Sequence, residues 1–427
     1  MADDAELLIA GGGLNGLALG IACAGAGLET ILVDRQDLAA TIAETFDGRA
    51  SAIAHGSKLV LDAIGVWPAI AAEAEPIREI RVADDASPLF LHYDHRDLAS
   101  GASGATPLGY IVENRVLRRA LLARAAELPA LSLVFPRAVA SIAATPAGVT
   151  ATLGDRSTRR IRLVAAADGK GSPLRRAAGI HAVEWRYDQI GIVTTVRHER
   201  PHAGIAIEHF LPAGPFAILP MTADPAPRRG ASDEAQAPLT PGWRSSLVWT
   251  EAAALAPRLV ALPDAEFTAE LRARFGGFLG HVEPVGPRFT YPLSLMQAET
   301  YIAPRLALIG EAAHVIHPIA GQGLNVGIRD VAALAEAIVD ARRLGLDIGA
   351  DSVLERYQRW RRLDAVMLAG VTDGLNRLFS NTIAPVKLAR DLGLAAVNQM
   401  PPLKRLLMQH AMGTLGDRPR LARGEAL

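Results

Sequence analysis

Residues 7–16 read LLIAGGGLNG, a short apolar run followed directly by closely spaced glycines. An apolar run of this length is typical of a buried parallel strand. The residues from Leu14 to Ala26 are rich in Ala and Leu, which favours a helix, and Gly27 ends it. A second apolar run, TILV at residues 30–33, predicts the next strand. The chain therefore begins with a strand, a glycine-rich turn, a helix and a second strand.

The glycines of this turn fit the pattern Gly-x-Gly-x-x-Gly. Gly11 permits the tight turn, Gly13 lets a pyrophosphate approach the backbone, and Gly16 lets the helix pack closely on the strand. The free N–H groups at the helix start, where Leu14 and Asn15 lie, then face the phosphates. The pattern predicts a dinucleotide site.

An acidic residue closes the second strand. Asp34 follows Gly16 by 18 residues, where a carboxylate can accept hydrogen bonds from both hydroxyls of an adenosine ribose. A carboxylate here also disfavours the 2′-phosphate of NADP. The alternative at this point is a glycine-rich turn between strand and helix that holds no ligand.

Two later stretches show the same predicted order of strand, turn and helix. The first, ADGKGSPLRR at residues 167–176, contains an Asp-Gly turn around Asp168 that is common at strand ends and alone indicates only a turn. The second combines LIGEAAH at 308–314 with PIAGQGLN at 318–325 and Asp330. A long helix begins near Gly323, and its positive end would lie against a flavin ring and stabilise the anion formed on reduction.

In this order and at these separations, the three motifs resemble those of the FAD-dependent aromatic hydroxylases with the para-hydroxybenzoate hydroxylase fold. Within that superfamily the chain, to about residue 412, is similar to the ubiquinone-biosynthesis hydroxylases, such as 2-polyprenyl-6-methoxyphenol hydroxylase. The stretches that carry the finer resemblance are FDGRA at 46–50, VENRVL at 112–117, GPFAILP at 214–220, SLVW at 246–249, and TDGL with NRLFS at 372–380.

The fold that we expect is α/β, with a Rossmann-like FAD-binding domain interleaved with an antiparallel-sheet substrate domain and followed by C-terminal helices. Patterns of period two in QIGIVTTVRH, AIEHFL and SSLVWT favour the antiparallel sheet independently. The expected boundaries are 1–75, 107–180 and 300–350 for the FAD-binding domain, 76–106 and 181–299 for the substrate domain, 351–412 for the helices and 413–427 for a flexible tail.

Smaller features are predicted from local patterns. Residues 131–166 alternate strand-like runs with turn signals, which predicts a small antiparallel meander. Residues 222–242 are rich in Pro, Ala and charge, which predicts a mobile surface loop. Helices are expected over 50–64, over 115–127 with Asn114 as the cap, over 351–380 and over 384–412.

The resemblance implies roles for residues that match the family motifs. Those expected at the ADP half are Gly11, Gly13, Leu14, Asn15, Gly16 and Asp34, with Arg35 beside the adenine. Those expected near the pyrophosphate, the ribityl chain or the pyridine nucleotide are Arg49, Arg115, Asp168, Gly310 and Glu311. Those expected to line the flavin ring are Pro318, Gly321, Gln322, Gly323, Leu324 and Asn325.

One departure from the family pattern concerns the residue after Gly310. The family usually has Asp there, whereas this chain has Glu311. The carboxylate is kept but its stem is one methylene longer, so its contact with the cofactor is expected to be shifted or bridged by water.

The activity that the resemblance implies is hydroxylation of a polyprenyl phenol in ubiquinone biosynthesis. NADH or NADPH would bind transiently and reduce FAD, and O₂ would give a flavin C4a-hydroperoxide whose distal oxygen passes to the ring. A soluble aromatic substrate, reduction of prenyl double bonds and a non-catalytic prenyl-binding escort remain alternatives. No catalytic base is assigned, because the candidates His209, Tyr187 and Tyr291 each also suit a core or surface role.

Composition limits the remaining possibilities. Half of the 427 residues are hydrophobic and 21% are charged, which excludes a disordered chain. The net charge of −1 provides no positive field for nucleic acid. Cys23 is the single cysteine, and His314 and His317 have no third ligand nearby, so no disulfide and no metal site are expected. No secretory signal and no run of about 18 apolar residues occurs, so a cytoplasmic protein is expected.

The C-terminal region suggests where such a protein works. From residue 385 to 427 there are seven Lys and Arg against three Asp and Glu, an excess of +4, among regularly spaced apolar residues. A basic amphipathic helix pair can lie on an anionic membrane surface. We therefore expect peripheral contact with the inner membrane face and with other quinone-biosynthesis enzymes. An ordinary packed helix pair is the alternative.

Overall fold

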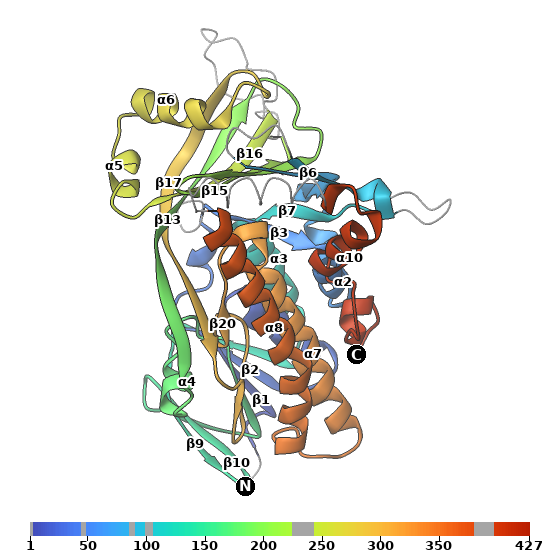
Figure 1. The fold of residues 1–427 in the computed structure, drawn as a ribbon. Helices are drawn as coiled ribbons and strands as arrows, with labels where there is room; N and C mark the ends of the chain where they lie inside the picture. Colours follow the sequence, from blue (N-terminus) through green and yellow to red (C-terminus); the bar gives the residue numbers. More distant parts are fainter. Residues whose placement is uncertain (1–2, 44–47, 85–89, 99–105, 224–242, 380–396) are drawn as a thin grey trace, which may run out of the picture.

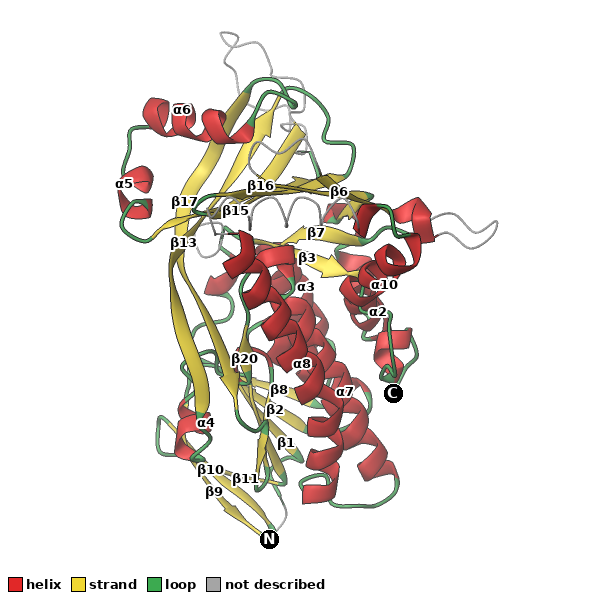
Figure 2. Ribbon diagram, viewed as in Figure 1, coloured by secondary structure: helices red, strands yellow, loops and turns green. Residues whose placement is uncertain are grey.

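The first strand of the chain lies inside a six-stranded sheet that is mostly parallel (Figures 1 and 2). The computed structural model describes residues 3–43, 48–84, 90–98, 106–223, 243–379 and 397–427. Strands β1, β2 and β12 are buried along their whole length, which explains why each is a continuous apolar run. In sheet order the strands are β18 (Ile302–Ala303), β19 (Leu306–Leu308), β12 (Leu163–Ala166), β1 (Leu7–Ala10), β2 (Thr30–Val33) and β8 (Leu131–Val134), with only β18 antiparallel.

Long helices cover this sheet. Helix α1 contacts both α3 and α7, and α7 packs against α8, which runs beside it in front of the sheet (Figure 2). Cys23 is buried in α1, where burial raises the pKa of its thiol to about 12, so it packs as a small hydrophobic residue. The helices of this group are α1 (Leu14–Gly25), α3 (Asn114–Ala126), α7 (Gly323–Arg343) and α8 (Asp351–Phe379).

A second, eight-stranded sheet forms the upper part of the molecule in Figure 1. It is antiparallel except between β14 and β5, and β13 and β17 run side by side for 17 residues each down toward α4 (Figure 1). In sheet order the strands are β20 (His314–Val315), β17 (Val282–Ala298), β13 (Ala182–His198), β16 (Trp243–Ala252), β15 (Gly214–Met221), β14 (Ile205–Leu211), β5 (Glu79–Asp84) and β6 (Phe90–Asp94).

The two faces of this sheet have different partners. On one face Phe216, Trp249 and their neighbours pack against α5 and α6, which supplies Phe267. The other face points toward the parallel sheet. Side chains alternate along each strand, so each strand supplies residues to both faces.

Two three-stranded sheets and several short helices make up the rest of the fold over the described residues. The small sheets are β3 (Ala50–Ala54), β7 (Gly109–Glu113) and β4 (Glu75–Ile77), and β11 (Thr158–Ile161), β10 (Gly148–Leu153) and β9 (Val139–Thr145). The other α-helices are α2 (His55–Ala63), α4 (Pro173–Ala177), α5 (Ala256–Val260), α6 (Asp264–Phe275) and α10 (Pro401–Ala411). The 3₁₀ turns are η1 (Ala40–Ile42), η2 (Trp67–Ala69), η3 (Ala71–Glu73), η4 (His95–Leu98), η5 (Gly310–Ala312), η6 (Ile319–Gly321) and η7 (Arg420–Arg423).

The predicted fold class is confirmed, but three local predictions are wrong. The first turn of the helix expected over 50–64 is strand β3, because its backbone pairs with β7. Within 131–166, only β9 to β11 form the meander, since the outer runs pair with the parallel sheet as β8 and β12. Asn114 is the first residue of α3 rather than its cap, and its Oδ1 accepts a hydrogen bond from Ser51 Oγ (2.6 Å).

Some predictions fall wholly or largely on segments outside the described residues, namely most of the loop at 222–242 and the first part of the helix at 384–412. The helix expected over 351–380 is confirmed to residue 379. Among the described residues, no helix is long and apolar enough to cross a membrane.

The C-terminal segment differs from the frayed tail that the sequence predicted over 413–427. Turn η7 packs against α2 and α7, and Leu421 is buried at 2% exposure. The backbone N–H of Arg420 donates to Glu336 Oε2 (2.6 Å), and its guanidinium pairs with Asp340 on α7. Pattern analysis missed this contact because its apolar content is small and its partners lie some 80 residues earlier.

Leu421→Ala tests whether the C-terminal turn contributes to stability. Removing a buried leucine side chain costs about 2–5 kcal/mol, so we expect a clearly lower free energy of unfolding in urea. Leu415→Ala is the matched control, because Leu415 is 45% exposed and its loss should change that energy by less than about 0.5 kcal/mol. Equal effects of the two changes would show that η7 does not stabilise the fold.

Candidate cofactor and substrate site

A cavity of about 1020 Å³ lies where the carboxyl ends of β1, β2 and β12 meet the inner face of the eight-stranded sheet. Its lining includes residues 10–16, 33–36 and 167–169, which follow those three strands. Ligands of open α/β sheets bind at this edge. The strand order therefore brings segments from the beginning and the middle of the chain to one site.

The glycine turn at the end of β1 is very tightly packed. Gly11 has φ +110°, and a Cβ there would overlap the carbonyl of Ala167. A Cβ at Gly16 would overlap the carbonyl oxygen of Gly11. Gly13 is different, because its φ of −68° suits any residue and no atom lies within 4 Å of an added Cβ. Gly11 and Gly16 thus shape the turn, while Gly13 leaves open space in front of it.

Asp34 lines the cavity at the end of β2. Its Oδ2 accepts a hydrogen bond from Gly12 N (2.5 Å), and its Oδ1 accepts one from Gln36 N (2.7 Å). An ionised carboxylate has about four acceptor positions, so capacity remains for ribose hydroxyls. The exposed Arg35 also lines this end of the cavity.

Two buried oxygens at this end point to a missing donor. Within the described residues, neither Asn15 Oδ1 nor Asp168 Oδ1 has a hydrogen-bond partner, and both residues line the cavity. Burial raises the pKa of Asp168, although hydrogen bonds from Ser172 and Leu174 act in the other direction. A buried acceptor without a partner costs stability, so these atoms suit a ligand with hydroxyl or N–H donors, as a dinucleotide has.

The loop before α7 forms the middle of the cavity. Its lining residues here are Pro318, Ile319, Gly321, Gln322, Gly323, Leu324 and Asn325. Nothing lies within 4 Å of a Cβ added at Gly323, so the positive end of the 21-residue helix α7 is open to the cavity. Asn325 lines the cavity, but its amide is already hydrogen-bonded, since it donates to Ala52 O (2.8 Å) and accepts from Ala54 N (2.9 Å), which fixes the loop on β3.

A buried charge network holds the strand end from which this loop starts. Asp330 accepts hydrogen bonds from Gly310 N (3.0 Å), His314 Nε2 (2.6 Å) and Arg361 Nε (2.8 Å). Burial alone would raise the pKa of Asp330, but the charges and hydrogen bonds of His314 and Arg361 outweigh it and hold that pKa below its ordinary value. Gly310 has φ +55° and abuts Asn15, so its role is close packing.

Most of the predicted site residues meet at this cavity, but Arg115 and Gly310 are not among its lining residues. Arg115 Nε donates to Glu113 Oε2 (2.6 Å). Arg118, three residues further along α3, lines the cavity instead and donates to Thr41 O (3.0 Å). The predicted residues that do line it are Gly11, Gly13, Leu14, Asn15, Gly16, Asp34, Arg35, Arg49, Asp168, Glu311, Pro318, Gly321, Gln322, Gly323, Leu324 and Asn325.

Sequence reasoning named Asn114 only as a cap and missed Arg118. The available signal was helical spacing, because residues four apart share a helix face and Asn114 also lines the cavity. Arg49 lies at the cavity with its guanidinium carbon 4.8 Å from the centre of the Tyr291 ring. Contacts of any of these residues with a cofactor remain predictions.

The far end of the cavity is apolar. One row of paired residues crosses the inner face of the sheet and consists of Leu91, Val82, Glu208, Ala217, Val248 and Val193. Opposite it, α8, α10 and the residue that caps α10 supply Leu368, Val371, Leu375, Phe379, Leu407, Met408 and Met412. This end suits a large apolar ligand.

Of the three candidate bases, only Tyr291 lines the cavity. His209 pairs with Phe216 in the row that faces α5 and α6, so its side chain points to the other face of the sheet. Tyr187 donates to Asp373 Oδ1 (2.8 Å). Sequence analysis did not consider Glu208, although it lies next to His209.

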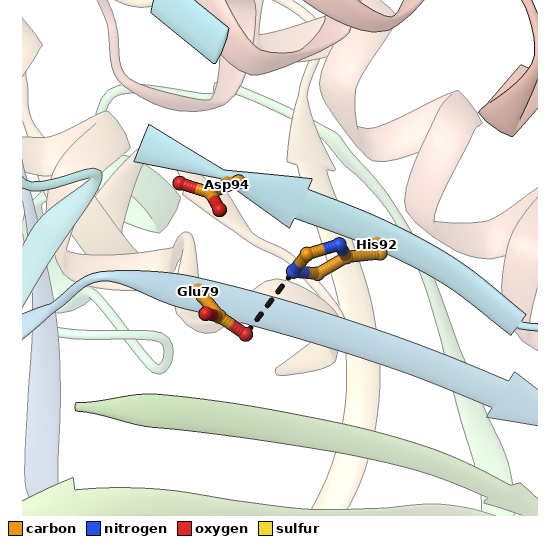
Figure 3. Close-up of side chains that lie close together, drawn as sticks. All are labelled: Glu79, His92 and Asp94. Atoms are coloured by element: carbon orange, nitrogen blue, oxygen red, sulfur yellow. Dashed lines mark hydrogen bonds and ion pairs between the residues drawn. The ribbon is translucent and has the colours of Figure 1, made fainter. Parts of the chain in front are cut away.

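A separate cluster of possible metal ligands lies on β5 and β6 (Figure 3). His92 Nε2 lies 3.1 Å from Glu79 Oε2, and Asp94 lies beside them. Arg96 donates to both oxygens of Asp94 through Nε (2.9 and 3.0 Å), and Arg81 pairs with Glu79 (2.9 Å). The guanidinium groups pair with both carboxylates and the His92–Glu79 contact links β6 to β5, so the cluster is an ion-pair network at the edge of the sheet.

Comparison with known proteins gives a consistent result. The model of the family described as FAD binding domain matches residues 4–368. The chain is 51% identical to the Ubiquinone hydroxylase UbiL of Rhodospirillum rubrum over 99% of this chain and 94% of that one. It is 32% identical to the 3-demethoxyubiquinol 3-hydroxylase of Escherichia coli, covering 96% of this chain and 98% of that one.

Solved structures agree on the fold. The p-nitrophenol 4-monooxygenase PnpA of Pseudomonas putida superposes with a TM-score of 0.76, covering 98% of this chain and 100% of that one at 19% identity. At this identity the likeness concerns the fold alone.

Gly13→Ala and Gly16→Ala separate the two roles of the glycine turn. At Gly13 a methyl group fits the apoprotein but occupies the space in front of the turn. Overpacking costs about 1–3 kcal/mol, so FAD affinity should fall about ten- to hundredfold while the melting temperature of the apoprotein stays the same. Gly16→Ala should lower both the FAD affinity and the melting temperature of the apoprotein, because the added Cβ meets the backbone of Gly11. Fluorescence titration with FAD and thermal melts distinguish them, and unchanged affinity in Gly13→Ala would contradict the assignment.

Proposed function

The chain belongs to the FAD-binding monooxygenase family, and from that premise we propose that it hydroxylates the aromatic ring of a polyprenyl phenol in ubiquinone biosynthesis, using NAD(P)H and O₂. One observation carries the proposal: a single cavity joins the glycine turn, the loop before α7 and a long apolar wall. A dinucleotide and an apolar ring can thus lie in contact. The similarity to proteins named as ubiquinone hydroxylases supports the substrate class.

The polar end of the cavity fits FAD. Gly13 leaves room for the pyrophosphate, Asp34 has acceptor capacity for the ribose, and Asn15 and Asp168 offer unpaired oxygens to hydroxyl or N–H donors. The open N-terminus of α7 at Gly323 would face the ring and favour negative charge on it. When bound, FAD reduced by NAD(P)H supplies the electrons that activate O₂.

The apolar end fits the prenylated ring. The lining from the sheet, α8 and α10 is aliphatic or aromatic along most of its length, which favours a ring with a hydrocarbon chain over a small polar aromatic. The same lining keeps water away from the site where oxygen is transferred. A soluble aromatic would leave much of this surface uncovered.

Loss of the gene tests the function directly. We expect a deletion strain to accumulate a prenylated quinone precursor that lacks one ring hydroxyl, identified by mass spectrometry. The purified protein should be yellow and should bleach with NAD(P)H faster when a phenol is added. A plasmid copy of the wild-type gene should restore quinone, and Gly13→Ala should restore less. Normal quinone in the deletion strain would favour a soluble aromatic substrate, and a colourless protein that binds prenyl lipid would favour an escort.

We further propose that the protein works in the cytoplasm and touches the inner membrane face through α8 and α10. Three large apolar side chains on α8, Leu363, Met367 and Val371, are 67%, 57% and 55% exposed. Their spacing places them along one face of the helix. Val371 also lines the cavity, as does Leu407 on α10, so the exposed apolar surface reaches the cavity entrance. A prenyl chain could pass there from the bilayer.

A charge placed on that face should weaken membrane binding. The double change Leu363→Glu and Met367→Glu should reduce co-sedimentation of the FAD-loaded protein with anionic vesicles, because both side chains would face lipid. Leu344→Glu is the control, since Leu344 is 75% exposed at the far end of α7. Equal co-sedimentation of all three proteins would overturn the proposed surface, and retained yellow colour shows that each variant is folded.

A further inference from the structure

The apolar wall of the cavity contains one carboxyl group, that of Glu208 on β14. Its row on the sheet is fixed by strand pairing, with Val82 on one side and Ala217 on the other. The remaining members of this row, Leu91, Val248 and Val193, are also apolar, and all six residues line the cavity. Because side chains alternate across a strand, Glu208 faces the cavity together with Phe210 and away from α5 and α6.

Glu208 lies close to the loop before α7. Phe210, two residues along β14 on the same face, packs with Ile319 of that loop and with Phe379 of α8. The rings of Phe210 and Phe379 are stacked with their centres 4.0 Å apart. This cluster holds β14 against the part of the cavity where the flavin ring is expected, and so places Glu208 where a ring substrate would lie.

The carboxylate of Glu208 makes no hydrogen bond or ion pair with any residue that the structure describes. Burial raises its pKa to about 8. A carboxyl group in an apolar wall costs stability when it ionises, and the native fold does not offset that cost here. Such unpaired, perturbed groups in a cavity are characteristic of functional sites.

Few titratable groups face Glu208 from the surrounding elements. Strand β5 supplies the buried Asp84, β6 supplies Tyr93 and β17 supplies Tyr291. Burial raises the pKa of Tyr93 to about 12, so it stays protonated. Farther along the lining are Arg49 and, on α10, His410. Strands β15 and β16 present apolar residues and Thr250, and the described part of α8 presents apolar residues and Thr372.

We propose that Glu208 is the general base for the substrate, accepting a hydrogen bond from the phenol hydroxyl and taking its proton as the ring is attacked. In this step the phenol O–H bond breaks, its electron pair stays on oxygen and flows into the ring, and a new O–H bond forms on Glu208. No further oxidant or reductant is needed for it. The inference rests on the proposed function, because it assumes a phenol in this cavity.

Binding of a simple phenol tests the contact without turnover. The probes are 2-octylphenol and its methyl ether, added to the FAD-loaded full chain, with flavin absorbance as the readout. The ionised carboxylate accepts the phenol hydrogen bond, so affinity for 2-octylphenol should rise several-fold between about pH 6 and pH 9, as Glu208 ionises and before the phenol does. The methyl ether has no proton to donate, so its affinity should not rise.

Glu208→Gln should abolish this pH dependence, because the amide does not titrate. With a phenol that the enzyme turns over, this variant should lose about 10²–10⁴-fold in kcat while KM rises no more than several-fold, and Glu208→Asp should recover part of the rate. The matched control is Glu283→Gln, which changes a glutamate of the same sheet that pairs with Arg197 (3.6 Å) and does not line the cavity. It should behave as the wild type.

The pH dependence of the melting temperature tests whether the carboxyl group of Glu208 is buried in the folded protein. The folded-state pKa of Glu208 is raised, so the wild type should lose stability as pH rises from about 4, its unfolded value, through about 8. Glu208→Gln should lack this loss and should melt higher at pH 9 if it is folded.

Two outcomes separate this inference from the proposed function. If 2-octylphenol shows the same pH dependence in Glu208→Gln as in the wild type, or if that variant keeps full kcat, the role of Glu208 is overturned even when the enzyme hydroxylates a quinone precursor. If the phenol effect depends on Glu208 but no quinone precursor accumulates in the deletion strain, the base assignment stands and the polyprenyl substrate is wrong. Failure of the probe to perturb the flavin at any pH overturns the phenol contact itself.

Discussion

The close approach of three backbone segments at the end of β1 determines the architecture of the site. Gly11, Gly16 and Ala167 approach so closely that a single Cβ would separate helix α1 from β1 or β1 from β12. Since β12 precedes the Asp168 turn and pairs on its other edge with β19, this contact also brings the strand that leads into the loop before α7 to the same edge. Three segments that are far apart in sequence form one cavity because their parallel strands end together.

Polarity divides the cavity, and the division follows the two sheets. The parallel sheet ends in backbone N–H groups, Asp34 and Asp168, which are suited to phosphate, ribose and amide groups. The eight-stranded sheet offers side chains from one face, and strand alternation keeps that face apolar while Phe216 and Trp249 fill the other. A carboxyl group therefore lies among other polar groups at the end formed by the parallel sheet. At the end formed by the eight-stranded sheet, an ionised carboxyl group costs stability because its surroundings are apolar. This contrast is why Glu208 stands out although Glu311 does not.

An element or site residue could be predicted from the sequence where the pattern that indicates it lies within a few neighbouring residues. The glycine turn, Asp34 and the start of α7 were predicted because short local motifs indicate each of them. Strand β3 was missed because its alanines favour a helix, and only pairing with β7 and the amide of Asn325 makes it a strand. Arg118 was missed in favour of Arg115 because the choice depends on the rotation of α3. The role of Glu208 depended on strand register, since a shift by one residue would have placed His209 in the cavity instead.

The departure at Glu311 is understandable from the buried network beside it. Gly310 is fixed by its N–H bond to Asp330 and by contact with Asn15, so the backbone at this point cannot move to suit a longer side chain. Asp330 in turn is held by His314 and Arg361, and breaking such a buried arrangement by removing one partner costs about 3–5 kcal/mol. The side chain of Glu311 is exposed at the cavity, where an added methylene extends into open space. A rigid backbone with an exposed side chain therefore lets the carboxylate of this chain be one methylene longer than an aspartate without disturbing the loop that follows.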